Sequence, residues 1–220
     1  MGNHRGFTLV EIALVLVIVG LLLGGVLKGE EMVAQARTKN AVADFNGVAA
    51  AYYGYQDRYR AIPGDDPGAG RWASGLAGDG NGQLSGAYNA ACPSGHGQPA
   101  AGTAESCLFW NDLRSAGFVA GNGAEQPFNA FAGMIGVQTG NAAGATSLGG
   151  FAGLILCTAD IPDKVAIAID TQMDDGQIDK GTVRGQSQTS PNPAIDATIP
   201  AADIPYRETG TNTYTICRSL

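Results

Sequence analysis

One carboxylate stands out in this sequence because it lies inside a long apolar segment. From Phe7 to Leu27 the chain has 21 residues, and Glu11 is the only charged one among them. A charge at the centre of a membrane-spanning helix costs about 2.5 to 3.5 kcal/mol, and less near an end, so it is normally kept where a partner neutralises it. Glu11 is therefore expected to pair with a positive group.

The sequence contains no recognisable catalytic motif. It contains no HExxH, no GxSxG, no phosphate-binding loop that ends in Lys-Ser/Thr and no plausible histidine-paired nucleophile. The acidic pairs Asp65/Asp66 and Asp174/Asp175 are adjacent in sequence, and neighbours in a turn are usually solvated, so they define no catalytic dyad. We expect a protein that is not an enzyme.

A possible calcium site is the one cofactor signal in the chain. Asp79-Gly-Asn-Gly-Gln imitates the start of a calcium loop, with oxygens on Asp79, Asn81 and Gln83. An EF-hand loop would need a Glu at its twelfth position, where Ala90 stands. Asp-Gly and Asn-Gly pairs are also typical of turns, which explains these residues without a bound ion. Calcium would therefore need an acidic residue from elsewhere in the fold.

Four cysteines follow the apolar segment: Cys92, Cys107, Cys157 and Cys217. An even number in a chain whose N-terminus directs it out of the cytoplasm predicts disulfides, and no Cys/His spacing suggests zinc. Four cysteines allow three pairings, and closure of a short Gly/Pro-rich stretch favours Cys92 with Cys107.

The element that positions the N-terminal groups is one long helix. Residues 7–61 contain no proline, and Ile62-Pro63-Gly64 ends the helical pattern. Such a helix is about 80 Å long, and its apolar first part, 7–27, is about long enough to cross a bilayer. One face of the second part has helical spacing and is expected to carry a globular head: Phe45, Val48, Ala49, Tyr52, Gln56 and Tyr59.

The rest of the chain is expected to form this head from helices and strands. The predicted elements are a helix over 105–116, a buried strand over 154–157, and strands over 177–184 and 206–217, with a surface loop over 185–200 that could accept O-glycosylation. Residues 160–170 fit either a helix, which Asp160 and Pro162 favour slightly, or a strand, which the alternation of Val165, Ile167 and Ile169 indicates.

The overall charge excludes one class of partner. The chain carries 13 Lys and Arg against 20 Asp and Glu, a formal charge of −7. General nucleic-acid binding needs clustered basic residues and is not expected.

The start of the chain resembles a type IV prepilin or a type II secretion pseudopilin. A short polar leader with Arg5, then Gly6, then Phe7-Thr-Leu-Val-Glu and an uninterrupted apolar run carry the resemblance. In that family a membrane aspartyl peptidase cuts after the glycine, here Gly6, and the new N-terminus, here Phe7, is N-methylated. Many pilins have a proline late in the apolar run, whereas this chain has Gly24-Gly25.

The resemblance implies an α+β, type IV pilin-like fold, in which a long N-terminal helix packs on an antiparallel sheet in the C-terminal head. The implied parts are a leader over 1–6, a transmembrane and assembly helix over 7–27, an amphipathic continuation over 28–61 and a pilin head over 62–220. It also implies a disulfide between Cys157 and Cys217, and a pairing of Glu11 with the Phe7 amine of a neighbouring subunit.

The resemblance further implies partners and a location. The partners are a prepilin peptidase, an inner-membrane assembly platform, the lipid bilayer before assembly, and other copies of the chain with minor pilins in a helical filament. The precursor would cross the bacterial inner membrane once, with its head in the periplasm, and the mature protein would stand in an extracellular filament.

Three functions stay open from the sequence. The preferred one is a structural subunit of a pilus-like filament on the cell surface. A pseudopilin would use the same N-terminus to build a short periplasmic piston for secretion, and a membrane-anchored binding protein or enzyme would never polymerise. A cleaved secretory signal is disfavoured because the apolar run is longer than such signals have and the glycine precedes it.

Overall fold

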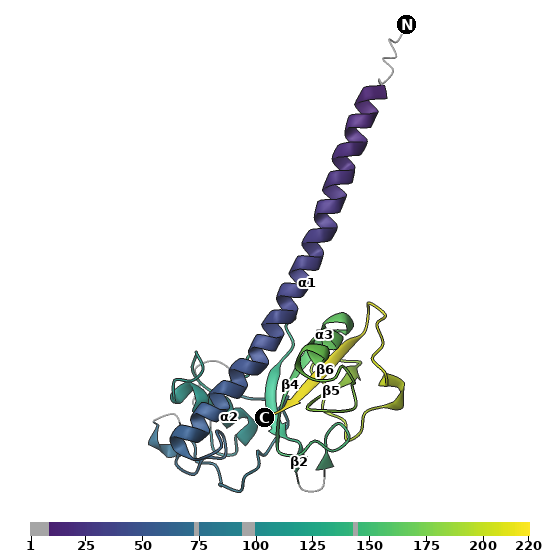
Figure 1. Ribbon diagram of the computed structural model, residues 1–220. Coiled ribbons are helices and arrows are strands. Elements are labelled where there is room, and N and C mark those ends of the chain that lie inside the picture. The colour runs from purple at the N-terminus through teal and green to yellow at the C-terminus, as the bar shows by residue number, and fades with distance from the viewer. Residues whose placement is uncertain (1–8, 73–74, 94–99, 143–144) are drawn as a thin grey trace. The chain divides into compact units, whose positions relative to one another are not determined.

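The computed structural model describes residues 9–72, 75–93, 100–142 and 145–220, and these residues form an α+β fold (Figure 1). Internal contacts divide the chain into two units, Met1–Lys39 and Asn40–Leu220. Helix α1, Leu9–Tyr59, contributes its first part to the N-terminal unit and its last part to the second unit, which we call the head unit. The expected long helix is therefore present over the described residues.

The part of α1 within the N-terminal unit is a helix whose apolar side chains lie on its surface. It contains no proline and is rich in Leu, Val and Ile, which explains its continuity. After the apolar run, Lys28 and Glu31 form an ion pair one turn apart at 2.6 Å. Because both side chains are exposed, this pair adds well under about 1 kcal/mol.

In the head unit, α1 buries one face against the rest of the domain. The buried positions recur every three or four residues, which is the helical period, at Ala41, Phe45, Val48, Tyr52 and Tyr55. They join the main core with strand residues such as Ile135 and Leu156. The predicted face is correct from Phe45 to Tyr52, after which Tyr55 continues it and Gln56 and Tyr59 are only partly buried.

Four antiparallel strands form the sheet of the head unit, in the order β1-β4-β6-β5. Their bounds are Ile135–Thr139 (β1), Leu154–Pro162 (β4), Val183–Gln188 (β5) and Thr213–Ser219 (β6). The other elements are the short pair β2, Asn141–Ala142, and β3, Ala145–Thr146; helices α2, Glu105–Ser115, and α3, Asp163–Met173; and 3₁₀ helices η1, Ala69–Arg71, and η2, Ala201–Asp203.

Strand β4 is central because its two faces belong to two different cores. Leu154 and Leu156 join the main core that includes α1, whereas Ile155 and Cys157 join a second core with Tyr88. This division follows from the strand geometry, in which successive side chains point to opposite faces.

Several predicted boundaries in the head were wrong. The strand predicted over 154–157 extends to Pro162, so the helix predicted over 160–170 begins only at Asp163. Asp160 is not its cap: it lies at an irregularity of β4 with a φ of 55°. The Asp163 carboxylate instead accepts hydrogen bonds from the backbone N–H groups of Lys164, Thr209 and Gly210.

The two later strands also begin later than predicted. Residues 177–182 form turns, and β5 starts at Val183 and runs into the segment predicted as a loop over 185–200. In the same way, residues 206–212 are irregular and β6 starts at Thr213. The helix predicted over 105–116 is α2, and β1 was not predicted at all.

Two disulfides link the cysteines in the pairs expected from the sequence. Cys92 is joined to Cys107 at the start of α2, and Cys157 is joined to Cys217 across the neighbouring strands β4 and β6. Closing loops of 15 and 60 residues restricts the unfolded chain, and the loop-entropy model assigns such bonds about 3 to 4 kcal/mol each.

Candidate functional site

The candidate assembly site is the first part of α1. The structure describes this helix from Leu9 onward, and it places Glu11 in the first turn with an exposed side chain. The predicted cleavage and methylation residues, Gly6 and Phe7, lie outside the described residues. A carboxylate in the first turn also lies near the positive end of the helix dipole, which is a favourable position for it.

The apolar surface that follows Glu11 is large, and no part of the chain that the structure describes covers it. All of the large apolar side chains described between Leu9 and Val33 are exposed, and Leu9 is 87% exposed. The helix has the length and composition needed to cross a membrane, and none of its most apolar 18-residue window is buried. A patch of this size on a folded protein marks a surface that lipid or another protein covers.

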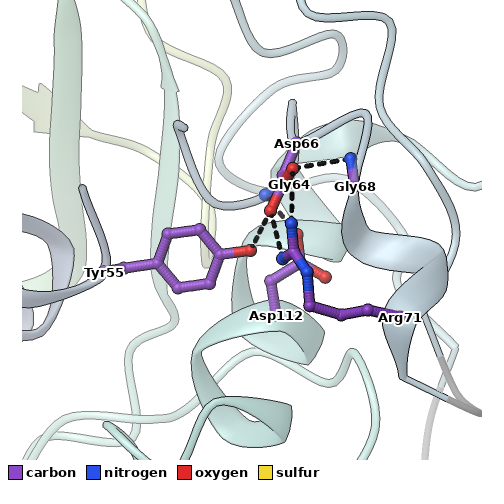
Figure 2. Close-up of polar contacts among 6 residues, drawn as sticks. All are labelled: Tyr55, Gly64, Asp66, Gly68, Arg71 and Asp112. Atoms are coloured by element: carbon purple, nitrogen blue, oxygen red, sulfur yellow. Dashed lines mark hydrogen bonds and ion pairs between the residues drawn. The ribbon is translucent and has the colours of Figure 1, made fainter. Parts of the chain in front are cut away.

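A buried polar network ties the end of α1 to the loop that follows it (Figure 2). The Tyr55 hydroxyl donates to Asp66 Oδ2 at 2.6 Å, and Arg71 Nη1 donates to the same oxygen at 2.6 Å. The backbone N–H of Gly68 donates to Asp66 Oδ1 at 2.7 Å. Burial alone would raise the pKa of Asp66, but the hydrogen bonds from Arg71, Tyr55 and Gly68 hold it below its ordinary value.

A second buried carboxylate, that of Asp112 on α2, lies beside this network (Figure 2). Its Oδ2 accepts a hydrogen bond from the backbone N–H of Gly64 at 2.7 Å. Burial, together with the negative charge of Asp66, raises the pKa of Asp112 to about 7. The two carboxylates thus differ in role: Asp66 has a positive partner in Arg71, whereas burial favours the neutral form of Asp112.

Sequence reasoning missed this network. The pair Asp65/Asp66 was expected to be solvated, but both side chains are buried, at 3% and 2% exposure. The expectation failed because the turn folds inward onto α1 and α2, which supply Tyr55 and the Asp112 that holds Gly64. No spacing in the sequence shows that residues 11 and 48 positions apart will meet.

The predicted calcium residues lie in a loop built around Asp65. The Asp65 carboxylate accepts backbone N–H groups from Gly80 at 2.6 Å, Asn81 at 3.1 Å and Gly82 at 2.7 Å. Carboxylate oxygens of Asp65, Asp79 and Glu105 lie within 4.8 Å of one another, a group that could hold a metal ion. Asn81 Nδ2 instead donates to Asp79, and Asn81 Oδ1 accepts the backbone N–H of Gln83.

The calcium hypothesis stays a prediction. Its acidic partners for Asp79 would be Asp65 and Glu105. An ion that binds only the folded chain stabilises it, so calcium is expected to raise the melting temperature of the head and a chelator to lower it. Asp79→Asn is expected to remove that shift, whereas the exposed Asp57→Asn should keep it. Equal melting temperatures with calcium and with chelator would leave the hydrogen bonds as the role of these carboxylates.

The other acidic group has a structural explanation. Asp170 accepts hydrogen bonds from the Gly176 backbone and the Tyr206 hydroxyl, and Asp174 accepts those of Thr182 and Val183. Asp170 is buried and Asp174 partly buried, so only the exposed Asp175 matches the solvated pair expected from the sequence. These carboxylates hold the end of α3 to the start of β5.

Comparison with known proteins identifies the N-terminal segment. Residues 1–27 match the family model of the prokaryotic N-terminal methylation motif. No curated protein and no solved structure matches the chain. The motif is the cleavage and methylation segment found in type IV pilins and pseudopilins, which confirms the resemblance seen in the sequence. The chain therefore begins with a prepilin-type methylation segment, and the long helix that starts within this segment, together with the α+β head, is consistent with a pilin-like fold.

Proposed function

We propose that this protein is a structural subunit of a type IV pilus-like extracellular filament. The observation that carries the proposal is the exposed apolar half of α1, which lies largely within the methylation segment, residues 1–27, and has Glu11 in its first turn. A surface of this kind needs lipid before assembly and other helices afterwards. A helical bundle of such segments provides that cover in the filament core.

The proposal includes an order of events. The precursor crosses the inner membrane once with its head in the periplasm, a prepilin peptidase cuts after Gly6, and Phe7 becomes N-methylated. An inner-membrane platform then adds the subunit to other copies and to minor pilins. Growth is open-ended because the contacts run head to tail and do not close.

The proposed role is structural and not enzymatic. In the described part of the head, the buried acidic groups Asp65, Asp66 and Asp163 accept hydrogen bonds from backbone and side-chain donors of neighbouring loops. These interactions stabilise the fold of the head, which supports a structural role for these carboxylates.

Mass spectrometry of filaments sheared from cells is the test of the proposal. The mature chain is expected as a component of these filaments. Filaments without the chain, despite good expression, would reject it, and the alternatives then divide on a second measurement. A secretion defect in the deletion strain would indicate a pseudopilin, whereas normal secretion would indicate an anchored protein that does not polymerise.

Processing gives a specific prediction about Gly6. The intact mass of the mature protein is expected to lack the first six residues and to carry one added methyl on Phe7. Gly6→Trp should leave the precursor uncut, because a large side chain does not fit where the peptidase accepts glycine.

Gly2→Trp is the matched control, with the same change in the same leader, and it should be cut normally. A mature protein that begins at Met1, or one cut after Leu27, would contradict the prepilin interpretation.

A further inference from the structure

A small hairpin in the head unit, residues 127–135, presents apolar side chains to solvent. Phe128 and Met134 are paired in an isolated antiparallel bridge, and Ile135 N donates to Pro127 O at 2.8 Å. Paired residues of two antiparallel strands project to the same face, so Phe128 and Met134 lie side by side. We call residues 127–135 the apolar hairpin.

The apolar hairpin is held in one conformation by Asn129. Its Nδ2 donates to Thr158 Oγ1 and to Ala159 O, both at 2.7 Å, which fixes the hairpin to β4. Its Oδ1 accepts the backbone N–H groups of Phe131 at 2.7 Å and Gly133 at 3.0 Å. Asn129 is the one polar residue between Pro127 and Ile135, and its side chain is buried. It therefore stabilises the hairpin from inside and adds no polar group to its outer surface.

The outer surface of the apolar hairpin is unusual for the head unit. Phe128 is 57% exposed, and Ala130 and Ala132 beside it are exposed as well. Among the described residues of the head unit, the other exposed large apolar side chains are Tyr53 and Ile204, which are not part of this hairpin. Single exposed apolar residues are ordinary, but an aromatic ring in a rigid, uncharged loop is typical of an interaction anchor.

The exposed first part of α1 is a surface with matching chemistry. Between Ile12 and Leu27 it has no charged residue, and its large apolar side chains are exposed. Three glycines interrupt these side chains, at Gly20, Gly24 and Gly25, and the space where a Cβ would stand is open at each of them. Glycines on a helix leave hollows in which another group can approach closely.

We infer that the apolar hairpin docks on the glycine-bearing segment of α1 in a second copy of this chain, with Phe128 as the anchor. The inference rests on the proposed filament function, because the exposed α1 surface of one subunit is available to its neighbours there. A rigid aromatic side chain loses little conformational freedom on docking, and an uncharged hairpin leaves no charge to desolvate. This contact adds a head-to-helix interface to the helix-to-helix contacts of the core.

Photo-crosslinking of assembled filaments locates the partner. A photoreactive phenylalanine analogue at position 128 is expected to give crosslinks between chains, and peptide mapping is expected to place them in residues 18–30. Crosslinks within one chain, crosslinks to another head or to a different protein, and the absence of any crosslink in intact filaments would each overturn the inference.

Substitution of Phe128 measures how much the contact matters. Phe128→Ser is expected to lower the yield of sheared filaments about tenfold, because a buried aromatic ring is lost from each interface. Phe128→Leu should restore most of the yield. Ile204→Ser is the matched control, since Ile204 is 42% exposed outside the hairpin, and it should assemble normally.

Two further measurements keep the result interpretable. The melting temperature of the Phe128→Ser chain in detergent is expected to equal that of the wild type, because the side chain is exposed in the folded head. If wild-type cells make filaments and the Phe128→Ser cells make as many, the inference is wrong and the filament function stands. If the wild type makes no filament that contains the chain, the proposed function itself fails.

Discussion

Replacing Glu11 by alanine is expected to abolish filaments while membrane insertion and cleavage after Gly6 stay intact. Insertion should survive because removal of a charge makes the segment more apolar. Assembly should fail because cleavage creates an amine on Phe7, and in the proposed filament the Glu11 carboxylate of one subunit neutralises the amine of another. Without that carboxylate the amine enters an apolar core with no partner.

The size of this effect follows from the cost of an unpaired charge. Breaking one partner of a buried ion pair costs about 3 to 5 kcal/mol. At about 1.4 kcal/mol for each tenfold change in an equilibrium constant, the affinity of the subunit for the filament end falls by more than about a hundredfold. A filament repeats this contact at every subunit, so its yield should fall below detection.

The measurement compares filament yield with the amount of cleaved precursor in the membrane. Glu30→Ala is the matched control, because Glu30 is an exposed carboxylate on the same helix beyond the apolar run, and its filaments should be normal. Glu11→Gln should behave like Glu11→Ala, since the amide has a similar shape but no charge. Wild-type assembly by either Glu11 variant would show that the carboxylate does not determine assembly.

Local features of the sequence predicted the parts of the fold that depend on local signals. The proline-free run before Ile62 gave α1, and the spacing from Phe45 to Tyr52 identified its buried face. The limits of α2 were found within one residue, because Gly117 ends its pattern. The methylation segment was recognised for a similar reason: it is contiguous, so its recognition does not depend on how the head folds.

Features that depend on distant contacts were missed or misplaced. Strand β1 contains Gly136, which weakens a strand pattern, yet a Cβ there would lie 2.0 Å from the carbonyl oxygen of Tyr88. The glycine is needed because another segment passes close to β1, and one sequence alone does not show that approach. Strand β5 was predicted to begin too early because the sequence of the turn over 177–182 resembles that of a strand. In the structure the Asp174 carboxylate holds Thr182 and Val183 at the end of this turn.

The burial of Asp66 and Asp112 was missed for the same physical reason, because it depends on contacts between residues far apart in the sequence. Adjacent acidic residues in a Gly/Pro-rich loop are normally solvated, and the exception for Asp66 depends on Tyr55 and Arg71. Asp112 is on a helix that is buried on nearly all sides, so no polar face distinguished it.

Asp112 is expected to make the head less stable as the pH rises through neutrality. The ordinary pKa of this carboxyl is 3.8, and in the folded head burial raises it to about 7. Between these two values the folded state holds a proton that the unfolded state has lost. The stabilisation from that proton is complete below the unfolded pKa and is lost as the pH rises through 7.

The charged and titratable groups beside Asp112 support this direction. Asp66 adds a negative charge that opposes ionisation, whereas Arg71 and the Gly64 N–H favour it without offsetting burial. Each pH unit in the window changes the free energy of unfolding by about 1.4 kcal/mol, so the change from pH 5 to pH 7 is about 2 to 3 kcal/mol. For a chain of this size that corresponds to about 5 to 10 °C in melting temperature.

Asp112→Asn isolates this contribution, because other titrating groups are common to both proteins and cancel in the difference. The amide stays neutral at every pH and keeps an oxygen for the Gly64 N–H. The variant is therefore expected to melt above the wild type, by a margin that widens by about 5 to 10 °C between pH 5 and pH 8. Asp57→Asn, at a side chain that is 84% exposed, should show no such widening. A margin independent of pH would mean that Asp112 is ionised throughout, and that Arg71 and Gly64 outweigh its burial.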